Sequence, residues 1–259
     1  NITLVGSAAD INTYLDTALN IQYTAATNVS GVAAATITVR ANDGAGSGDV
    51  NLGTVNVNVS AVNDVPVFTG LDGTPSYTEG GAAQILDANV TIGDVELDAL
   101  NGGNGQYNGA SLSLVRNGGA NSQDIFSLVS GGNLTVAGGP DGGGTISAGG
   151  NIIANIANSG ATGQLQINFV DNTTAPSRAL VNEVMQAIRY SNNSNDPAAN
   201  VQIDWTFSDG NSVNTQGTGS NPGTATGSVT VGITNVSDAP SLSATGGNPT
   251  FTEGGGAQD

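Results

Sequence analysis

The acidic residues of this chain are grouped. Four of its 21 Asp and Glu residues fall within twelve positions, namely Asp87, Asp94, Glu96 and Asp98. Only four basic residues, all Arg, are present to neutralise them. Carboxylates placed this close repel one another in a compact fold unless a cation lies between them, and oxygen ligands without His or Cys favour Ca²⁺ over transition metals. The alternative is that these acids are simply solvated and keep a β-rich protein soluble.

The residue types that are missing exclude most catalytic chemistry. The chain has no His, Cys or Lys, so it cannot form a His-based triad, a thiolate nucleophile, a Schiff base or a structural zinc site. We therefore expect that it is not an enzyme. The net charge of −17 argues against nucleic acid and anionic membranes as partners. No apolar run approaches the roughly 18 residues of a membrane-spanning helix, so we expect no membrane insertion.

A long internal repeat organises the chain. Residues 62–84 realign on residues 236–258 at a constant offset of 174, with 11 of 23 positions identical. A second match places Tyr23 on Tyr190 and Asp43 on Asp209. The repeat predicts three segments: 1–65 as the C-terminal part of one unit, 66–239 as a complete unit, and 240–259 as the start of the next. We expect that the chain is a piece of a longer array.

Short segments of alternating apolar and polar residues dominate each unit. This period of two predicts antiparallel strands with one face on a core. Asn-Gly and Asp-Gly pairs, including Asp72-Gly73 and Asp209-Gly210, separate the segments as turns. The predicted fold class is therefore all-β, a Greek-key sandwich of two sheets. The alternating apolar residues are Val55, Val57 and Val59; Leu165, Ile167 and Phe169; Val201, Ile203, Trp205 and Phe207; and Val229, Val231 and Ile233.

One short helix is predicted in each unit. Leu180, Val184 and Ile188 are spaced by four, and Ser7 with Asp10 has the spacing of a capping box before the corresponding segment. A unit of 174 residues is longer than the roughly 100 of an immunoglobulin-type domain. We place the surplus in the Gly- and Asn-rich residues 99–160.

The residues that recur at fixed places resemble a known family. AVNDVP (61–66) and NVSDAP (235–240) look like the linker between cadherin repeats, and TEGG (78–81 and 252–255) is similar to its Glu-bearing first strand. GDVELD (93–98) resembles the two-acid loop, and ANDG (41–44) and FSDG (207–210) resemble the late Asp turn. Together they resemble the cadherin-like, calcium-binding tandem repeats of large bacterial surface adhesins exported by type I secretion, which implies a cadherin/immunoglobulin-like sandwich.

The resemblance implies Ca²⁺ at the junctions between units. Its ligands at the junction near Pro66 would be Asn63, Asp64, Asp209, and Asp94 with Glu96 or Asp98. Near Pro240 they would be Glu79 and Asp238, with Glu183 as a further candidate. A junction of this kind holds neighbouring repeats of the same chain in line.

Three functions follow as hypotheses. The first is a structural, calcium-stiffened extender of an extracellular bacterial adhesin at the cell surface, acting in surface or cell-cell adhesion and biofilms. The second is a repeating subunit of a self-assembling extracellular filament or sheath, with homotypic contacts between chains. The third is a carbohydrate-binding module that uses residues 99–160 to bind surface glycans.

Overall fold

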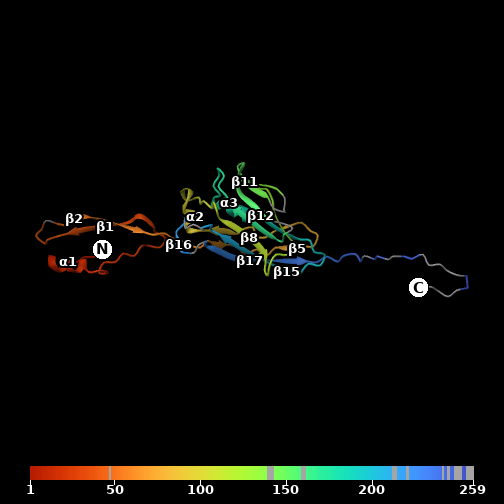
Figure 1. The fold of residues 1–259 in the computed structure, drawn as a ribbon, viewed down its shortest axis with the longest axis horizontal. Coiled ribbons are helices and arrows are strands. Elements are labelled where there is room, and N and C mark those ends of the chain that lie inside the picture. The colour runs from red at the N-terminus through yellow and green to blue at the C-terminus, as the bar shows by residue number, and fades with distance from the viewer. Residues whose placement is uncertain are drawn as a thin grey trace.

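The computed structural model describes residues 1–46, 48–138, 143–158, 162–211, 215–219, 222–240, 242–243, 246–247 and 253–254. Figure 1 shows a central β-sandwich, with the N-terminal residues on one side of it and the C-terminal residues on the other. Most of the predicted third segment, 240–259, lies outside the described residues, and so do parts of the Gly-rich stretch within 99–160. The fold is predominantly β, as predicted.

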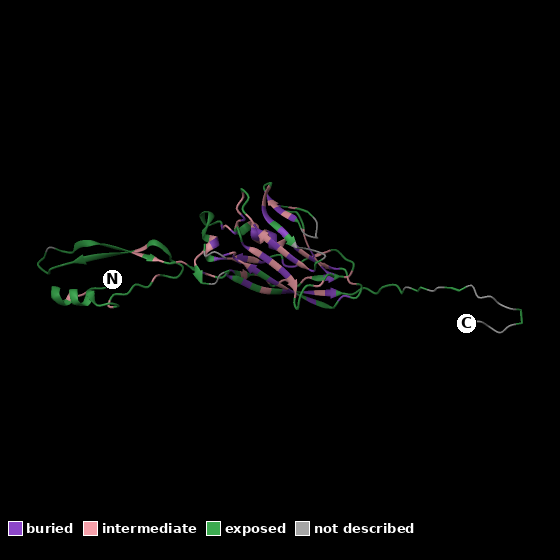
Figure 2. Ribbon diagram, in the orientation of Figure 1, coloured by how far each residue is buried: buried purple, intermediate pink, exposed green. Residues whose placement is uncertain are grey.

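The N-terminal segment forms a helix and a hairpin. Helix α1 (Ala8–Asp16) begins at Ser7, whose hydroxyl accepts a hydrogen bond from the Asp10 amide, so the predicted cap is confirmed. Strands β1 (Gly31–Ala41) and β2 (Val50–Val59) pair in antiparallel register and, among the described strands, with no other partner. Figure 2 shows this segment as almost entirely exposed. The alternation of Val55, Val57 and Val59 is therefore present in β2, but Val55 is exposed and none of the three is fully buried by the described residues.

The largest sheet has eight strands. Its order is β10-β11-β12-β13-β8-β15-β17-β5, and its neighbours are antiparallel except β17 and β5, which are parallel. The parallel edge pair is a departure from the all-antiparallel prediction. The strands are β5 (Ser76–Thr78), β8 (Ser111–Arg116), β10 (Leu134–Ala137), β11 (Gly144–Ala148), β12 (Asn151–Asn158), β13 (Gln164–Phe169), β15 (Asn200–Ser208) and β17 (Thr224–Thr234).

Three smaller sheets complete the fold. Strands β6 (Gln84–Ile85), β14 (Ile188–Asn192) and β9 (Asp124–Leu128) form one of them. Strand β4 (Val67–Thr69) pairs with β7 (Thr91–Gly93), and β3 (Val62–Asn63) pairs in parallel with β16 (Thr218–Gly219). Sheets on two sides of one core give the molecule its sandwich character.

The core consists of the residues that the alternation predicts. All of the named apolar residues of β13, β15 and β17 are buried, and Trp205 is completely so. Phe68 of β4 meets the Trp205 ring edge to face at 6.4 Å, which packs the small β4-β7 sheet onto the large one. Every buried apolar residue in the described part of the chain lies between Tyr77 and Ile233. The three predicted segment boundaries remain predictions.

The helices differ in part from the prediction. Helix α3 (Arg178–Gln186) begins at Ser177, and its buried residues are Val181, Val184 and Met185. The buried face therefore differs from the predicted one. The helix ends at Gln186, and Ile188, which was expected on that face, belongs to β14. A second helix, α2 (Val95–Ala99), follows Asp94 in what was expected to be a loop, and a short 3₁₀ turn, η1 (Asn101–Gly103), comes after it. The described part of 66–239 therefore has two α-helices and not one.

The predicted turns are correct in one case and need a correction in another. Gly210 has a φ of +76°, as the Asp-Gly turn requires. Gly73 does not have positive φ. This position requires glycine for another reason, because a Cβ there would lie 2.2 Å from the Leu86 carbonyl oxygen. The Asp87 carboxylate accepts the amides of Asp72 and Gly73, so this acid orders a turn. The described part of 99–160 is mainly sheet, from β8 to β12.

Candidate metal centre

The linker enters the sandwich beside the late Asp turn. Strand β3 brings Asn63 into a buried position, where its amide nitrogen donates a hydrogen bond of 2.7 Å to Oδ2 of Asp209. Asp209 directly follows β15 and Asn63 precedes β4, so two residues far apart in sequence meet where the chain enters the fold. The structure thus brings these two predicted site residues into contact, and their role as metal ligands stays a prediction.

Asp209 is fully buried and holds its own loop together. Its Oδ1 accepts the amide of Asn211 at 2.9 Å, and both carboxylate oxygens accept the amide of Gly223 at 3.0 Å. A Cβ on Gly223 would lie 2.5 Å from Asp209 Oδ2, so only glycine allows this approach. The carboxylate thus closes the loop between β15 and β17.

Asp94 supplies a buried oxygen without a protein partner. It is the N-cap of α2, and its Oδ1 accepts the Leu97 amide at 2.9 Å. Its Oδ2 is buried and accepts no hydrogen bond from any described residue. The pKa of Asp94 is raised from 3.8 to about 6, chiefly by burial and to a smaller extent by the negative charges of Glu96 and Asp209.

Glu96 connects the helix to the linker. Its Oε2 accepts the backbone amide of Asp64 at 3.2 Å. Its pKa is also raised, first by burial and then by the charges of Asp64 and Asp209. Asp64, Asp94, Glu96 and Asp209 are therefore one electrostatic group, which we name the linker-end cluster, and Asn63 is its amide member.

Asp98 has a different environment from Asp94 and Glu96. Its Oδ1 accepts the Tyr107 hydroxyl at 2.7 Å, and its Oδ2 lies 3.2 Å from the Arg178 guanidinium. Burial and the Asp98 carboxylate both raise the pKa of Tyr107, which keeps the phenol protonated as a donor. Asp98 is thus paired with Arg178. Of the two acids that the sequence offered as alternatives, Glu96 and Asp98, it is Glu96 whose side chain contacts the linker.

The residues predicted near Pro240 are only partly brought together. Glu79 Oε2 accepts the Val236 amide at 2.8 Å, so this carboxylate does contact the second linker. Asp238 is exposed and makes no hydrogen bond or ion pair with the described residues. Asp196, which the sequence reasoning missed, accepts the Asn235 side chain at 3.0 Å. Glu183 instead accepts the amide and side chain of Asn133, and thereby holds the turn before β10.

In the described structure, the side chains of the linker-end cluster do not form a complete coordination sphere for a metal ion. Among the described residues, no three acidic side chains already have a geometry that could hold a metal ion. Much of the Asp209 carboxylate is taken up by N–H donors. The oxygen that fits an added cation is Asp94 Oδ2, because it is buried, carboxylate-borne and otherwise without a partner in the described structure.

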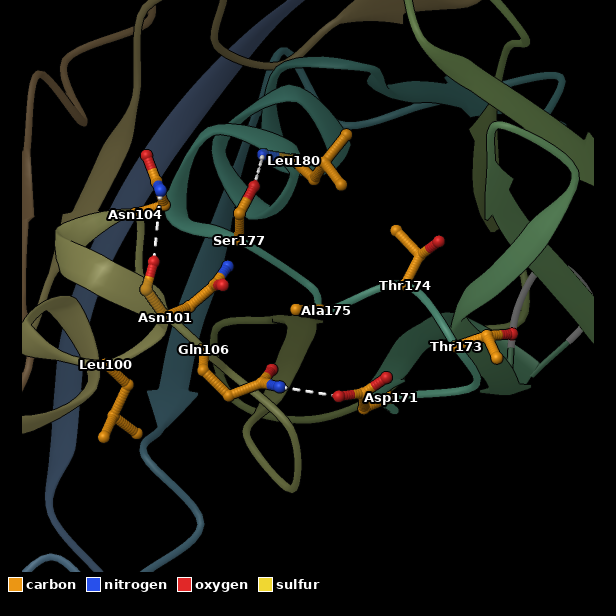
Figure 3. A pocket seen from close by; sticks show the side chains of 10 residues that line it. All are labelled: Leu100, Asn101, Asn104, Gln106, Asp171, Thr173, Thr174, Ala175, Ser177 and Leu180. Atoms are coloured by element: carbon orange, nitrogen blue, oxygen red, sulfur yellow. Dashed lines mark hydrogen bonds between the residues drawn. The ribbon is translucent and has the colours of Figure 1, made fainter.

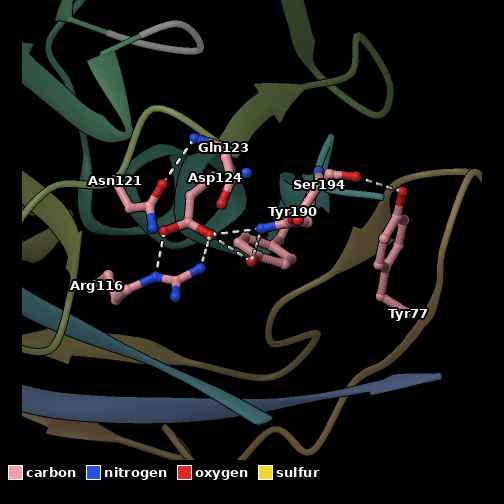
Figure 4. A network of polar contacts seen from close by, with 8 residues as sticks. Tyr77, Arg116, Asn121, Gln123, Asp124, Tyr190 and Ser194 are labelled. Atoms are coloured by element: carbon pink, nitrogen blue, oxygen red, sulfur yellow. Dashed lines mark hydrogen bonds and ion pairs between the residues drawn. The ribbon is translucent and has the colours of Figure 1, made fainter. Parts of the chain in front are cut away.

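A second acid network, shown in Figure 4, joins the two main sheets and was not predicted from the sequence. Asp124 of β9 is fully buried and accepts two hydrogen bonds from Arg116 of β8, at 2.6 and 2.5 Å. The Tyr190 hydroxyl and the Asn192 amide donate to the same carboxylate at 2.6 and 3.0 Å. Because every charge here is paired, this network is structural.

Comparison with known proteins gives no family. No protein-family model matches the chain, and no curated protein matches its sequence. Within the described residues, none of the helices has the length and apolar character needed to cross a membrane.

Proposed function

We propose that the chain is a calcium-stiffened extender from a large extracellular bacterial adhesin, built of cadherin-like Greek-key units of about 174 residues. The supporting observation is that Asp64, Asp94, Glu96 and Asp209 converge where the linker enters the sandwich, with Asp94 Oδ2 buried and unpartnered in the described structure. A cation at this place would touch both the linker and the sandwich. The direction of the linker relative to the sandwich would then be fixed.

The energetics favour a divalent ion over an empty cluster. The raised pKa values of Asp94 and Glu96 mean that burial, and to a smaller extent repulsion from neighbouring carboxylates, opposes their ionised forms. A divalent cation reverses both penalties, because it supplies positive charge and replaces lost hydration with direct coordination. Side chains from the linker-end cluster would provide hard oxygen ligands, which suit Ca²⁺. Small rotations of Asp64 and Glu96, both half-buried, would be needed to complete the site.

The second linker leaves at the opposite end of the sandwich from the first (Figure 1). Units joined through these two ends would extend in a line, with neighbouring repeats as partners. Glu79 already contacts the backbone of this linker at Val236, and Asp238 would join it as a ligand once the following unit is in place. On this proposal the protein works outside the cell, at the bacterial surface, and has no catalytic role.

A filament or sheath subunit is the second candidate, and the β1-β2 hairpin favours it. Within the part of the chain that the structure describes, no second layer covers this hairpin, and Val32, Leu52 and Val55 are among the large apolar side chains it exposes. Open strands with apolar faces invite pairing with another chain. The extender hypothesis requires such faces to be covered within one polypeptide, whereas a filament would cover them between protomers.

A calcium titration tests the proposal. We expect millimolar Ca²⁺ to raise the melting temperature and to lengthen the particle in small-angle X-ray scattering, while equimolar Mg²⁺ does much less. Saturation at a hundred times the dissociation constant adds about 2.7 kcal/mol per site. Asp94→Asn should abolish most of the response, whereas Asp72→Asn, a change at an exposed acid outside the cluster, should preserve it. Identical melting curves in chelator and in calcium would refute the proposal.

A further inference from the structure

A pocket lined by none of the linker-end cluster residues lies beside helix α3. Figure 3 shows it beneath the first turn of α3, with the 3₁₀ turn η1 on one side and the loop after β13 on the other. Its volume is about 840 Å³, which falls within the range of ligand-binding sites in proteins. None of the chemistry discussed above uses this pocket.

The pocket is lined by neutral polar side chains and one carboxylate. Asn101, Asn104, Gln106, Thr174 and Ser177 provide amides and hydroxyls, and Asp171 provides the carboxylate. The Gln106 amide donates to Asp171 Oδ2 at 2.7 Å, which fixes both side chains across the floor in Figure 3. Two polar groups are therefore already oriented before any ligand arrives.

The lining groups are mainly hydrogen-bond acceptors. Asp171 is exposed, so its carboxylate can accept further hydrogen bonds beside the one from Gln106. Asn101 and Asn104 use their N–H groups on the backbone carbonyls of Gly105 and Asn101, at 3.3 and 3.1 Å. The Ser177 hydroxyl accepts the Leu180 amide as the cap of α3. A ligand that fits these groups must bring several donors.

The side chains that line the pocket disfavour several classes of ligand. An anion is disfavoured, because the lining has no basic side chain and the chain carries a net charge of −17. A divalent cation is disfavoured, because only one carboxylate is present. An apolar peptide finds only Leu100, Ala175 and Leu180 as anchors. Hydroxyl groups of a neutral saccharide supply many donors, and its C–H faces can rest on Leu100 and Leu180.

We infer that this pocket is a binding site for a short neutral saccharide, held by hydrogen bonds from its hydroxyls to the Asp171 carboxylate and to the side-chain oxygens of Asn101 and Asn104. The site does not depend on the linker-end cluster, since none of the cluster residues lines it. In an extender it would give each unit its own weak contact with glycans, and many units in a row would add these contacts together.

The experiment uses the whole chain and a panel of short neutral gluco-, manno-, galacto- and xylo-oligosaccharides, first on an array and then by calorimetry. We expect at least one panel member to bind. Asp171→Ala should weaken that binding about tenfold or more, because it removes the charged acceptor and releases Gln106. Asn172→Ala is the matched control, since Asn172 is the exposed neighbour of Asp171 but is not part of the lining. Its affinity should equal that of the unchanged chain.

A second variant guards against a trivial loss of folding. Ala175→Leu places an apolar side chain in the hollow and adds no hydrogen-bonding group, so it should block the saccharide while the circular dichroism spectrum stays unchanged. Three results would overturn the inference: no binding by any panel member at millimolar concentration, binding by both pocket variants that is as tight as that of the unchanged chain, or binding that disappears in chelator and returns with Ca²⁺. The last result would make a bound cation the feature that the sugar recognises.

Discussion

The side-chain amide of Asn63 donates a 2.7 Å hydrogen bond to the carboxylate of Asp209, 146 residues further along the chain, and both residues are buried. This bond joins the linker to the loop that closes the β15-β17 hairpin. Removing Asp209 therefore affects both the linker and the loop.

Asp209→Ala should cost about 2 kcal/mol or more of unfolding free energy, because it leaves the buried amides of Gly223 and Asn211 without their acceptor. The comparison is Asn63→Ala, which removes the linker's hydrogen bond to Asp209 but leaves the loop amides with their acceptor, so it should cost less. Urea denaturation of both variants in chelator measures the difference. Equal costs would show that Asp209 does not organise the loop.

The raised pKa of Asp94 predicts that the stability of the metal-free protein depends on pH. Its pKa is about 6 in the folded state and 3.8 in the unfolded chain. Between these values the folded state binds more protons, so this group lowers stability as the pH rises from about 4 to about 6. Asp94→Asn keeps the cap oxygen of α2 and cannot ionise. In chelator it should therefore gain roughly 2 kcal/mol relative to the unchanged protein on going from about pH 4 to about pH 7.

The sign of this difference is the decisive measurement. Thermal melts of the two proteins across the pH range give it directly, and Asp72→Asn serves as the control. A flat difference would mean that Asp94 is not buried next to other charges. In saturating Ca²⁺ the order should reverse, because the ion stabilises the ionised Asp94 and finds a weaker ligand in Asn.

Removing one member of the Arg116–Asp124 pair should lower the free energy of unfolding more than replacing both members by apolar residues. Arg116→Met leaves the fully buried Asp124 charge without its cation, and we expect a loss of about 3–5 kcal/mol. The double variant Arg116→Met with Asp124→Leu removes the uncompensated charge and should recover part of this loss. A double-mutant cycle by urea denaturation measures the coupling; additive losses would argue against a paired network.

Trp205 tests the core. Trp205→Ala should cost roughly 3–5 kcal/mol, because it empties a fully buried position that Phe68 contacts. The indole nitrogen of Trp205 has no hydrogen-bond partner in the described structure. Trp205→Phe also removes that unsatisfied donor, so it should cost only about 1–2 kcal/mol. Comparable losses for the two variants would place Trp205 outside the core.

The strands were predictable and the local roles of the acids were not. Val201 to Phe207 alternate because one face of β15 meets the core, and that pattern is written in consecutive residues. By contrast, Asp98 pairs with Arg178, and this contact depends on how α3 packs near α2. Helix α2 spans only five residues, too few for a helical period to appear. The Asp196–Asn235 contact likewise arises from the tertiary fold.

The exposed hairpin makes a prediction about association. The described β1-β2 hairpin presents apolar side chains to solvent on strands that pair only with each other, so the 259-residue chain should associate as its concentration rises. A shortened chain of residues 61–239 keeps Ala61, whose carbonyl accepts the Thr218 amide, and keeps Asn63 against Asp209. It should be a monomer with an intact linker-end cluster. Sedimentation velocity over a concentration series compares the two chains. If the shortened chain associates, the surface responsible for association lies on the sandwich and not on the hairpin. If the 259-residue chain stays monomeric at every concentration, the filament hypothesis loses its support.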